Sequence, residues 1–97
     1  MKRPNLRISL IISTYNRPDM LRVCLESVQR QRMMPDEVII ADDGSTDETR
    51  ELIDLIRPDF TLPLKHVWHE DKGFRKAAIL NAATREAEDN NFVIYID

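Results

Sequence analysis

Two adjacent carboxylates, Asp42 and Asp43, are the first candidates for chemistry in this chain of 97 residues. They follow a short apolar run and precede Gly44 and Ser45, so they fall where a predicted strand gives way to a turn. Adjacent side chains at a strand end cannot both face the core, so we expect at least one carboxylate to be open to a ligand. A carboxylate accepts hydrogen bonds from a pyrimidine N–H or a ribose hydroxyl. The plainer alternative is a turn in which Asp43 or Ser45 caps the next helix.

Two further segments could contact the same ligand. Thr14-Tyr15-Asn16-Arg17 follows the first apolar run, and a tyrosine there can lie flat on a nucleotide base while its hydroxyl stays in water. Arg75 follows Gly73-Phe74 at a predicted helix start, where free N–H groups and the helix dipole favour an anion such as a pyrophosphate. The plainer interpretations are that Tyr15 is an ordinary loop aromatic, that Arg17 is a solvated residue at a helix start, and that Arg75 is a surface arginine.

Other polar residues give weaker signals. His66 and His69 are three residues apart, and residues at that spacing in a strand point to opposite faces, so we do not expect them to chelate a metal together. Glu70-Asp71 is typical of a solvated loop. Cys24 is the single cysteine and lies on the apolar side of a predicted helix, which indicates a small buried side chain rather than a disulfide or a reactive thiol.

The elements that must position these residues are four short apolar runs alternating with three helical patterns. The runs are rich in Ile and Val and nearly continuously apolar, as strands covered on both faces tend to be. Pro18 suits a first helical position, and a capping box formed by Ser45 and Glu48 should open the second helix. We expect strands over residues 6–13, 37–41, 64–68 and 92–96, and helices over 18–32, 45 to the proline at 58, and 74–89.

This alternation predicts an α/β fold of three layers, with a mostly parallel sheet and helices on both faces. We expect the strand order 3-2-1-4, in which the fourth strand returns to lie beside the first. That reversal leaves a crevice at the carboxyl ends of strands one and four, where open α/β sheets bind ligands. The segments after strands one and two, together with Asp97 after strand four, then meet at or beside one crevice.

Length and charge bound the class of protein. Residues 1–97 predict a single domain, and their 14 basic and 17 acidic residues are mixed along the chain, without the basic stripe typical of nucleic-acid binding. The apolar run near the start is far shorter than the roughly 20 residues of a membrane span, so we expect a cytoplasmic protein, with any membrane attachment at the inner face made by the full-length protein. A final strand with an unpaired edge predicts a truncated chain that self-associates.

Together these segments resemble the family 2 glycosyltransferases of the GT-A fold. The resemblance extends over nearly the whole chain in the right order, and the first two motifs at this separation are highly specific. The third motif most resembles bacterial enzymes that build capsules and other surface polysaccharides. The matching stretches are ISLIISTYNR at 8–17, EVIIADDGSTD at 37–47, GFRKAAILN at 73–81 and YID at 95–97. The resemblance implies the N-terminal half of a GT-A fold.

The resemblance also implies roles for single residues. Thr14 and Tyr15 match positions that cradle the nucleotide base. Asp42 matches the aspartate that reads the uracil, and Asp43 looks like its partner in the same loop. Arg75 matches a basic residue that faces the base or the diphosphate.

Asp97 resembles the first aspartate of the family's Asp-X-Asp motif, which holds Mn²⁺ or Mg²⁺ against the diphosphate. A hard cation prefers oxygen ligands and offsets charge on the departing nucleoside diphosphate. Arg17 joins the nucleotide-binding candidates, and Asn81 matches a polar position without an assigned role. The second aspartate of the motif, the acceptor site and the catalytic base match nothing in residues 1–97, so no catalytic residue is assigned and this part alone is expected to be inactive.

The resemblance implies that this chain is the donor-binding part of an inverting, hexosyltransferase-type enzyme. It would use a UDP-sugar and transfer a hexose-type sugar to a saccharide or glycolipid acceptor. The alternative is a non-catalytic nucleotide-sugar-binding or assembly module. A dinucleotide oxidoreductase requires a glycine-rich turn after strand one, but the two glycines are Gly44 and Gly73. A signalling receiver domain would carry its acidic pair after strand one rather than strand two.

Overall fold

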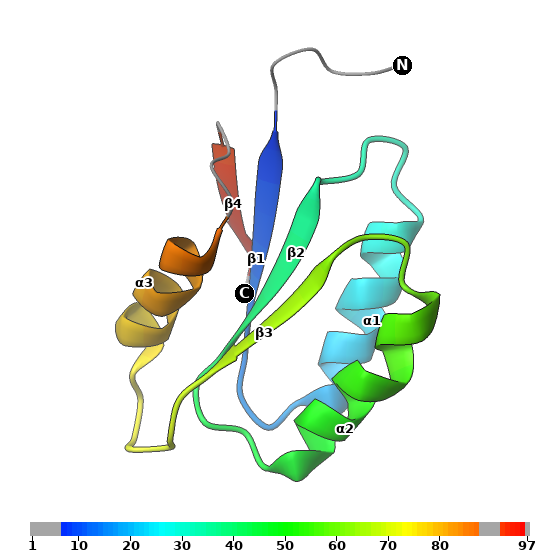
Figure 1. Ribbon diagram of the computed structural model, residues 1–97. Coiled ribbons are helices and arrows are strands. Elements are labelled where there is room, and N and C mark those ends of the chain that lie inside the picture. Colours follow the sequence, from blue (N-terminus) through cyan, green and yellow to red (C-terminus); the bar gives the residue numbers. More distant parts are fainter. Residues whose placement is uncertain (1–6, 88–91, 97) are drawn as a thin grey trace.

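The computed structural model describes residues 7–87 and 92–96 and shows one sheet with helices on both faces (Figure 1). Its four strands are all parallel and follow the order β3-β2-β1-β4. The strands are β1 (Ile8–Thr14), β2 (Glu37–Asp42), β3 (Leu64–Trp68) and β4 (Phe92–Ile96). The predicted α/β architecture and strand order are therefore confirmed.

The central strands are apolar along most of their length because helices cover both of their faces. All six residues of β2 are buried, as are four consecutive residues of β1. In the parallel register, Ile12 lies opposite Ile40 and Ile11 lies opposite Ile39. The first pair belongs to the core on one face of the sheet, and the second pair to the core on the other.

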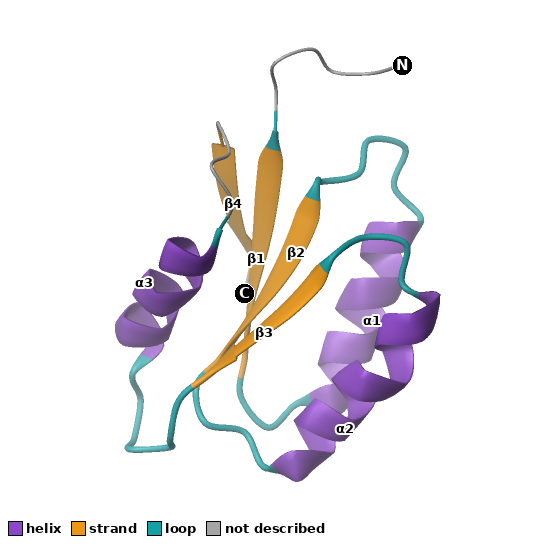
Figure 2. Cartoon of the chain, viewed as in Figure 1, coloured by secondary structure: helices purple, strands orange, loops and turns teal. Residues whose placement is uncertain are grey.

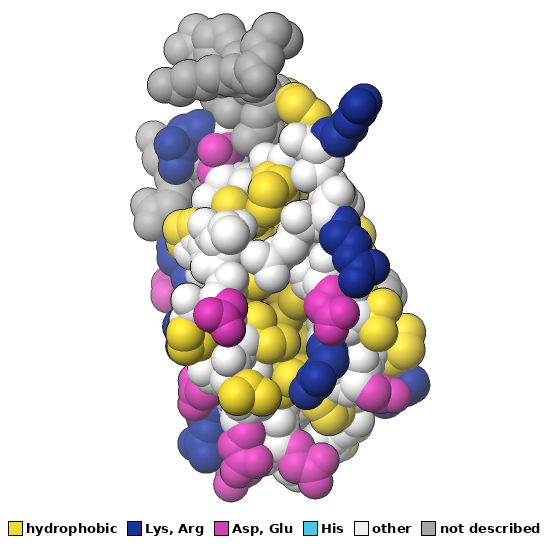
Figure 3. Space-filling view, turned by 90° about the vertical axis from the view of Figure 1, so that its right-hand side faces the viewer, with side chains coloured by type: hydrophobic (Ala, Val, Ile, Leu, Met, Phe, Trp, Pro, Cys, Tyr) yellow, Lys and Arg dark blue, Asp and Glu magenta, His cyan; other side chains and the backbone are white. Residues whose placement is uncertain are grey.

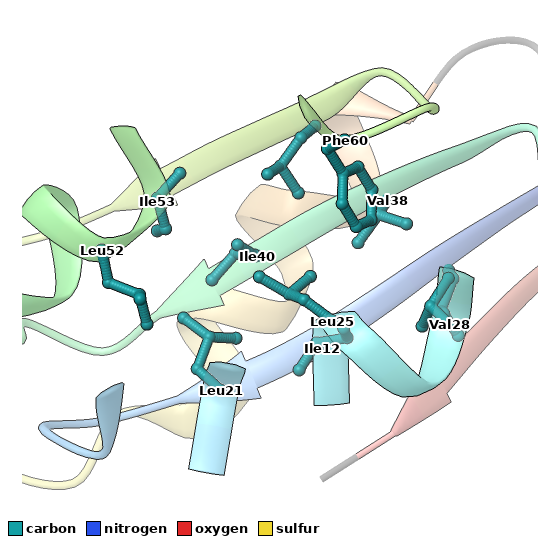
Figure 4. Packing of buried hydrophobic residues seen from close by; sticks show 11 residues of the cluster. Ile12, Leu21, Leu25, Val28, Val38, Ile40, Leu52, Ile53 and Phe60 are labelled. Carbon is teal, nitrogen blue, oxygen red and sulfur yellow. The ribbon is translucent and has the colours of Figure 1, made fainter. Parts of the chain in front are cut away.

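Helices α1 (Pro18–Gln29) and α2 (Asp47–Ile56) cover one face of the sheet (Figure 2). Pro18 occupies the first turn of α1 as predicted, and Pro58 ends α2 within a short 3₁₀ turn, η1 (Arg57–Asp59). Burying each large aliphatic side chain in this core contributes roughly 1.5–3 kcal/mol. The buried side chains of this core include Ile12, Leu21, Leu25, Val28, Val38, Ile40, Leu52, Ile53 and Phe60 (Figure 4). Cys24 is half-buried against them.

Helix α3 (Lys76–Glu86) packs on the opposite face of the sheet. The predicted apolar stripe is confirmed, because Ile79 and Ala83 are buried and Ala82 and Ala87 pack against the same core. The predicted bounds 74–89 are wrong at both ends. The backbone before the helix is not helical, with Arg75 at φ −130°, and Ala87 is extended at φ −65° and ψ 140°.

Two surfaces show how this fold meets solvent. The outer face of α1 and α2 carries both basic and acidic side chains, with hydrophobic side chains between them (Figure 3). On β4, Phe92, Ile94 and Ile96 lie in register with Ile8, Leu10 and Ile12 and remain 56%, 46% and 39% exposed. Within the described residues, no helix has the length and hydrophobicity needed to cross a lipid bilayer.

Candidate functional site

A cavity of about 690 Å³ opens at the carboxyl end of β1, with α1 on one side and the start of α3 on the other. Its size falls within the roughly 300–1,000 Å³ typical of small-molecule sites. It lies at the carboxyl end of β1, one of the two strands predicted to border the crevice, whereas its lining, among the described residues, includes none from β4. The lining residues come from four segments: Ile12, Ser13, Thr14, Tyr15 and Arg17; Met20, Leu21 and Cys24; Ala41 and Asp43; Asp71, Gly73, Phe74, Lys76 and Ile79.

Most of the predicted site residues lie at this cavity, but not all of them line it. Thr14, Tyr15, Arg17 and Asp43 are among the lining residues. Asp42 is buried, with 1% of its surface exposed, and does not line the cavity. Arg75 has an exposed side chain and reaches the site through its backbone amide.

Asp42 is an internal anchor of the turn after β2. Its Oδ1 accepts a hydrogen bond from the Ser45 amide at 2.8 Å, and its Oδ2 lies 2.8 Å from His66 Nε2. Burial raises the pKa of the Asp42 carboxyl, but hydrogen bonds from His66 and Ser45 together outweigh it and leave the pKa below its ordinary value of 3.8. An ionised carboxylate only accepts, so His66 Nε2 carries the proton. The role of Asp42 in reading a base stays a prediction.

Asp43 joins three segments at the wall of the cavity. Its Oδ1 lies 2.5 Å from His69 Nε2, and its Oδ2 accepts a hydrogen bond from the Arg75 amide at 2.9 Å. Its own amide donates to the Thr14 carbonyl at 3.1 Å, which extends the pairing of β1 and β2. Burial raises the pKa of Asp43, but the contacts with His69 and Arg75 outweigh it and lower the pKa. The anion at the start of α3 is therefore the carboxylate of Asp43.

His66 and His69 are site residues that the sequence analysis missed, because it considered them only as a metal-binding pair. Each imidazole instead contacts one carboxylate of the acidic pair. The predicted strand order contained a usable signal, since it places strand three beside strand two, with both carboxyl ends at one edge. In the part of the chain that the structure describes, no three His, Cys, Asp or Glu side chains form a group that could hold a metal ion.

Tyr15 and Asp71 meet across the mouth of the cavity. The Tyr15 hydroxyl donates to Asp71 Oδ2 at 2.7 Å, and the other carboxylate oxygen accepts from the Gly73 amide at 3.1 Å. The hydrogen bond to Asp71 raises the pKa of Tyr15 above 10.0. Glu70 and Asp71 both lie exposed in the loop after β3, as expected, and the carboxylate of Asp71 in addition organises this loop. Tyr15 as a whole remains 47% exposed, which leaves it available as a stacking surface.

Asn16 ties the loop after β1 to the loop after β2. The backbone amide of Asn16 donates to Ser45 Oγ at 2.8 Å, and its side-chain oxygen accepts from the backbone amide of Thr46 at 2.8 Å. The predicted capping box is wrong, because the Ser45 hydroxyl is engaged by Asn16 and Thr46 precedes α2 without a side-chain cap. Asn16 lies at φ 49°, a left-handed conformation that asparagine tolerates better than most residues.

Gly44 lets the loop after β3 approach the loop after β2. Its φ is +94°, and a Cβ built there would lie 2.5 Å from the Asp71 Cα and 2.6 Å from the Asp71 amide nitrogen. Gly73 has a similar φ of +87°, but a Cβ there would meet nothing within 4 Å. Gly44 is therefore required by both conformation and space, and Gly73 by conformation alone.

Comparison with known proteins identifies the family of this chain. Residues 9–97 match the model of the family described as Glycosyl transferase family 2. The chain is 39% identical over 82 residues to validoxylamine A glucosyltransferase of Streptomyces hygroscopicus subsp. limoneus, which covers 82% of this chain and 18% of that protein. It is 34% identical over 91 residues to chondroitin synthase of Escherichia coli, covering 93% of this chain and 13% of that protein.

A third relative is the teichoic acid poly(glycerol phosphate) polymerase of Staphylococcus epidermidis, 30% identical over 87 residues, or 90% of this chain and 12% of that protein. The chain thus spans less than a fifth of the length of each of these three relatives. The chain belongs to glycosyl transferase family 2, and its four-stranded sheet is the N-terminal half of the GT-A fold.

Replacing Gly44 with alanine should destabilise the protein more than the same change at Gly73. Both variants carry the cost of a positive φ, about 1–2 kcal/mol, but only Gly44→Ala must also displace the Asp71 backbone. Urea unfolding of the two variants measures the difference. Equal losses of unfolding free energy would contradict the close packing of these two loops.

Replacing Asp42 with alanine should lower the free energy of unfolding by about 2–3 kcal/mol at pH 7, because the Ser45 amide and His66 lose a buried acceptor. The pKa of the Asp42 carboxyl in the folded protein lies below its ordinary value of 3.8. The ionised carboxylate therefore contributes its full stabilisation above pH 3.8 and loses it as the pH falls through the folded pKa. The difference in unfolding free energy between wild type and Asp42→Ala, measured by urea unfolding, should therefore become smaller below about pH 4. Asp54→Ala on the exposed side of α2 is the control, expected to change stability by no more than about 0.5 kcal/mol. A gap that is independent of pH would contradict this account.

Proposed function

We propose that this chain is the donor-binding part of a glycosyltransferase that uses a nucleotide sugar. The observation that carries the proposal is the cavity at the carboxyl end of β1, lined by Tyr15 and Asp43, in a chain of family 2. Family membership and relatives named as glycosyltransferases and polysaccharide synthases support glycosyl transfer as the activity of the full-length protein.

We assign the nucleoside to the wall formed by the loops after β1 and β2. The exposed ring of Tyr15 offers a stacking surface beside Thr14, and the carboxylate of Asp43 offers a hydrogen-bond acceptor to the base or ribose. Each carboxylate oxygen can accept a second hydrogen bond, so Asp43 can bind a ligand without releasing His69 or Arg75. Asp42 is shielded from the cavity and would need its turn to shift before it could read uracil directly.

We favour a uridine diphosphate sugar as the donor, with the basic side chains of Arg17 and Arg75 available to the diphosphate. The divalent cation, Mn²⁺ or Mg²⁺, would be held by Asp97, which lies outside the described residues. The names glucosyltransferase and chondroitin synthase among the relatives support a hexose-type sugar and a saccharide acceptor, and a glycolipid acceptor stays a prediction. The cytoplasmic location stays a prediction.

Neither Asp42 nor Asp43 is assigned as the base that deprotonates the acceptor. Both carboxyl groups have lowered pKa values, which makes them weak bases. Both also hold imidazoles and backbone amides that fix the loops. We therefore assign the catalytic base to neither residue.

Titration of ¹⁵N-labelled protein with UDP should shift amide resonances around Tyr15, Asp43 and Arg75, and GDP should shift them less at the same concentration. Added Mg²⁺ should strengthen UDP binding and add shifts at Asp97, because a cation held by that carboxylate would offset the charge of the diphosphate. Equal responses to UDP and GDP would contradict the uridine assignment. A folded protein that binds neither nucleotide would contradict the donor-site proposal.

The exposed edge of β4 supports a second proposal, self-association of the chain. β4 lies at an edge of the described sheet, where backbone groups can pair with a second copy, and Phe92, Ile94 and Ile96 leave apolar side chains exposed on the face beside that edge. Light scattering after size exclusion should show a mass that rises with protein concentration, and Ile94→Lys should suppress that rise. Leu55→Lys, at a position 69% exposed on α2, is the matched control and should leave the rise unchanged. A constant monomer mass at high concentration would contradict self-association.

A further inference from the structure

His69 is placed at the cavity by the last backbone pairing between two strands. Its amide donates to the Asp42 carbonyl at 3.4 Å, which carries the pairing of β2 and β3 one residue beyond Trp68. That pairing brings the imidazole to the carboxylate of Asp43, with side-chain exposures of 20% for His69 and 11% for Asp43. The contact is therefore partly shielded from water, whereas the Tyr15 contact with Asp71 is exposed.

We propose that His69 is a positioning residue of the donor site, which holds Asp43 at the cavity wall and, through Asp43, holds the start of α3 against the site. This inference rests on the proposed function, because it assigns His69 a part in binding the nucleotide. His69 itself does not line the cavity, so it acts through Asp43.

The first argument is the way in which Asp43 divides its two oxygens. One oxygen faces His69 and the other accepts from the Arg75 amide, so a single carboxylate connects the end of β3 with the start of α3. Without the imidazole, the side chain of Asp43 would be free to rotate, and its bond to Arg75 would compete with water. The two contacts fix the carboxylate together because each restricts the same side-chain torsions.

The second argument is what the segment between His69 and α3 contributes. Asp71, Gly73 and Phe74 from this segment line the cavity. Asp71 is also held by Tyr15 and lies against Gly44, but the first contact is exposed and the second only limits space. A hydrogen bond to a carboxylate is stronger in a partly buried setting than on the surface, so the contact of Asp43 with His69 should hold this segment more firmly than the contact between Tyr15 and Asp71 does.

The third argument is the contrast with the neighbouring pair. His66 and Asp42 make a similar contact, but Asp42 is 1% exposed and does not line the cavity, so that pair belongs to the interior of the turn. Asp43 both lines the cavity and contacts an imidazole. Loss of His69 therefore changes the wall of the site itself.

The chemistry required at position 69 is a hydrogen-bond donor at the end of a planar side chain. The carboxylate of Asp43 only accepts, so His69 Nε2 must carry a proton. Glutamine places an amide N–H at a comparable reach and should replace the imidazole, whereas leucine fills similar space without a donor. Asparagine keeps an amide on a side chain one methylene shorter, which does not reach.

The test compares His69→Leu, His69→Gln and a control, Glu70→Gln, at a neighbouring exposed position whose side chain is absent from the cavity lining. Three quantities are measured for each protein: the Kd for UDP by calorimetry, the chemical shift of the Arg75 amide without nucleotide, and urea unfolding. His69→Leu should weaken UDP binding at least about tenfold, or 1.4 kcal/mol, and move the Arg75 amide resonance. His69→Gln should restore both, and Glu70→Gln should change neither.

A merely structural role would lower stability without following this pattern. The positioning role is overturned if folded His69→Leu binds UDP within about twofold of wild type, or if His69→Gln recovers stability but not affinity. If His69→Leu does not fold, His69→Asn takes its place with the same expected losses. A wild-type protein that binds no nucleotide contradicts the proposed function, whereas equal binding by wild type and variant contradicts the positioning role alone.

Discussion

The hydrogen bonds of the Asp43 carboxylate hold together the loops on which the site depends. The carboxylate of Asp43 is mostly buried and lies next to that of Asp42 in the sequence. Two such charges are stable only when hydrogen-bond donors replace the water that they lose. Here the donors come from His69 after β3 and from Arg75 before α3, while the backbone amide of Asp43 donates to the carbonyl of Thr14 at the end of β1. The end of β1, the turn after β2 and the segment between β3 and α3 therefore meet at one residue, Asp43.

Most of the fold could be predicted from local sequence. The continuous Ile and Val runs indicated strands buried on both faces, and the alternation with helical patterns indicated a parallel sheet with crossovers. The errors lay at the ends of elements: the first strand ends at Thr14 rather than residue 13, and the first helix ends at Gln29 rather than Arg32. The third helix is shorter than predicted, because the backbone of Arg75 before it is not helical and Ala87 after it is extended.

The site could be predicted only in part, because its decisive contacts join distant residues. The sequence placed Thr14, Tyr15, Arg17 and Asp43 at one crevice through the topology of the sheet. It could not show that Asp42 turns inward, because that depends on His66, 24 residues away. Tyr15 and Asp71 are 56 residues apart. Where the local pattern was strong, as in the capping box at Ser45, a long-range bond from Asn16 replaced it.

The central claim is that the fixed carboxylate of Asp43 and the exposed ring of Tyr15 form a wall that receives the nucleoside of a nucleotide sugar. A crystal structure of the protein with bound UDP tests this claim most directly. The account predicts the uracil ring against Tyr15, with Asp43 still in contact with His69 and the Arg75 amide. Nucleotide bound elsewhere on the fold, or a bound complex in which Asp43 has left both partners, would contradict it.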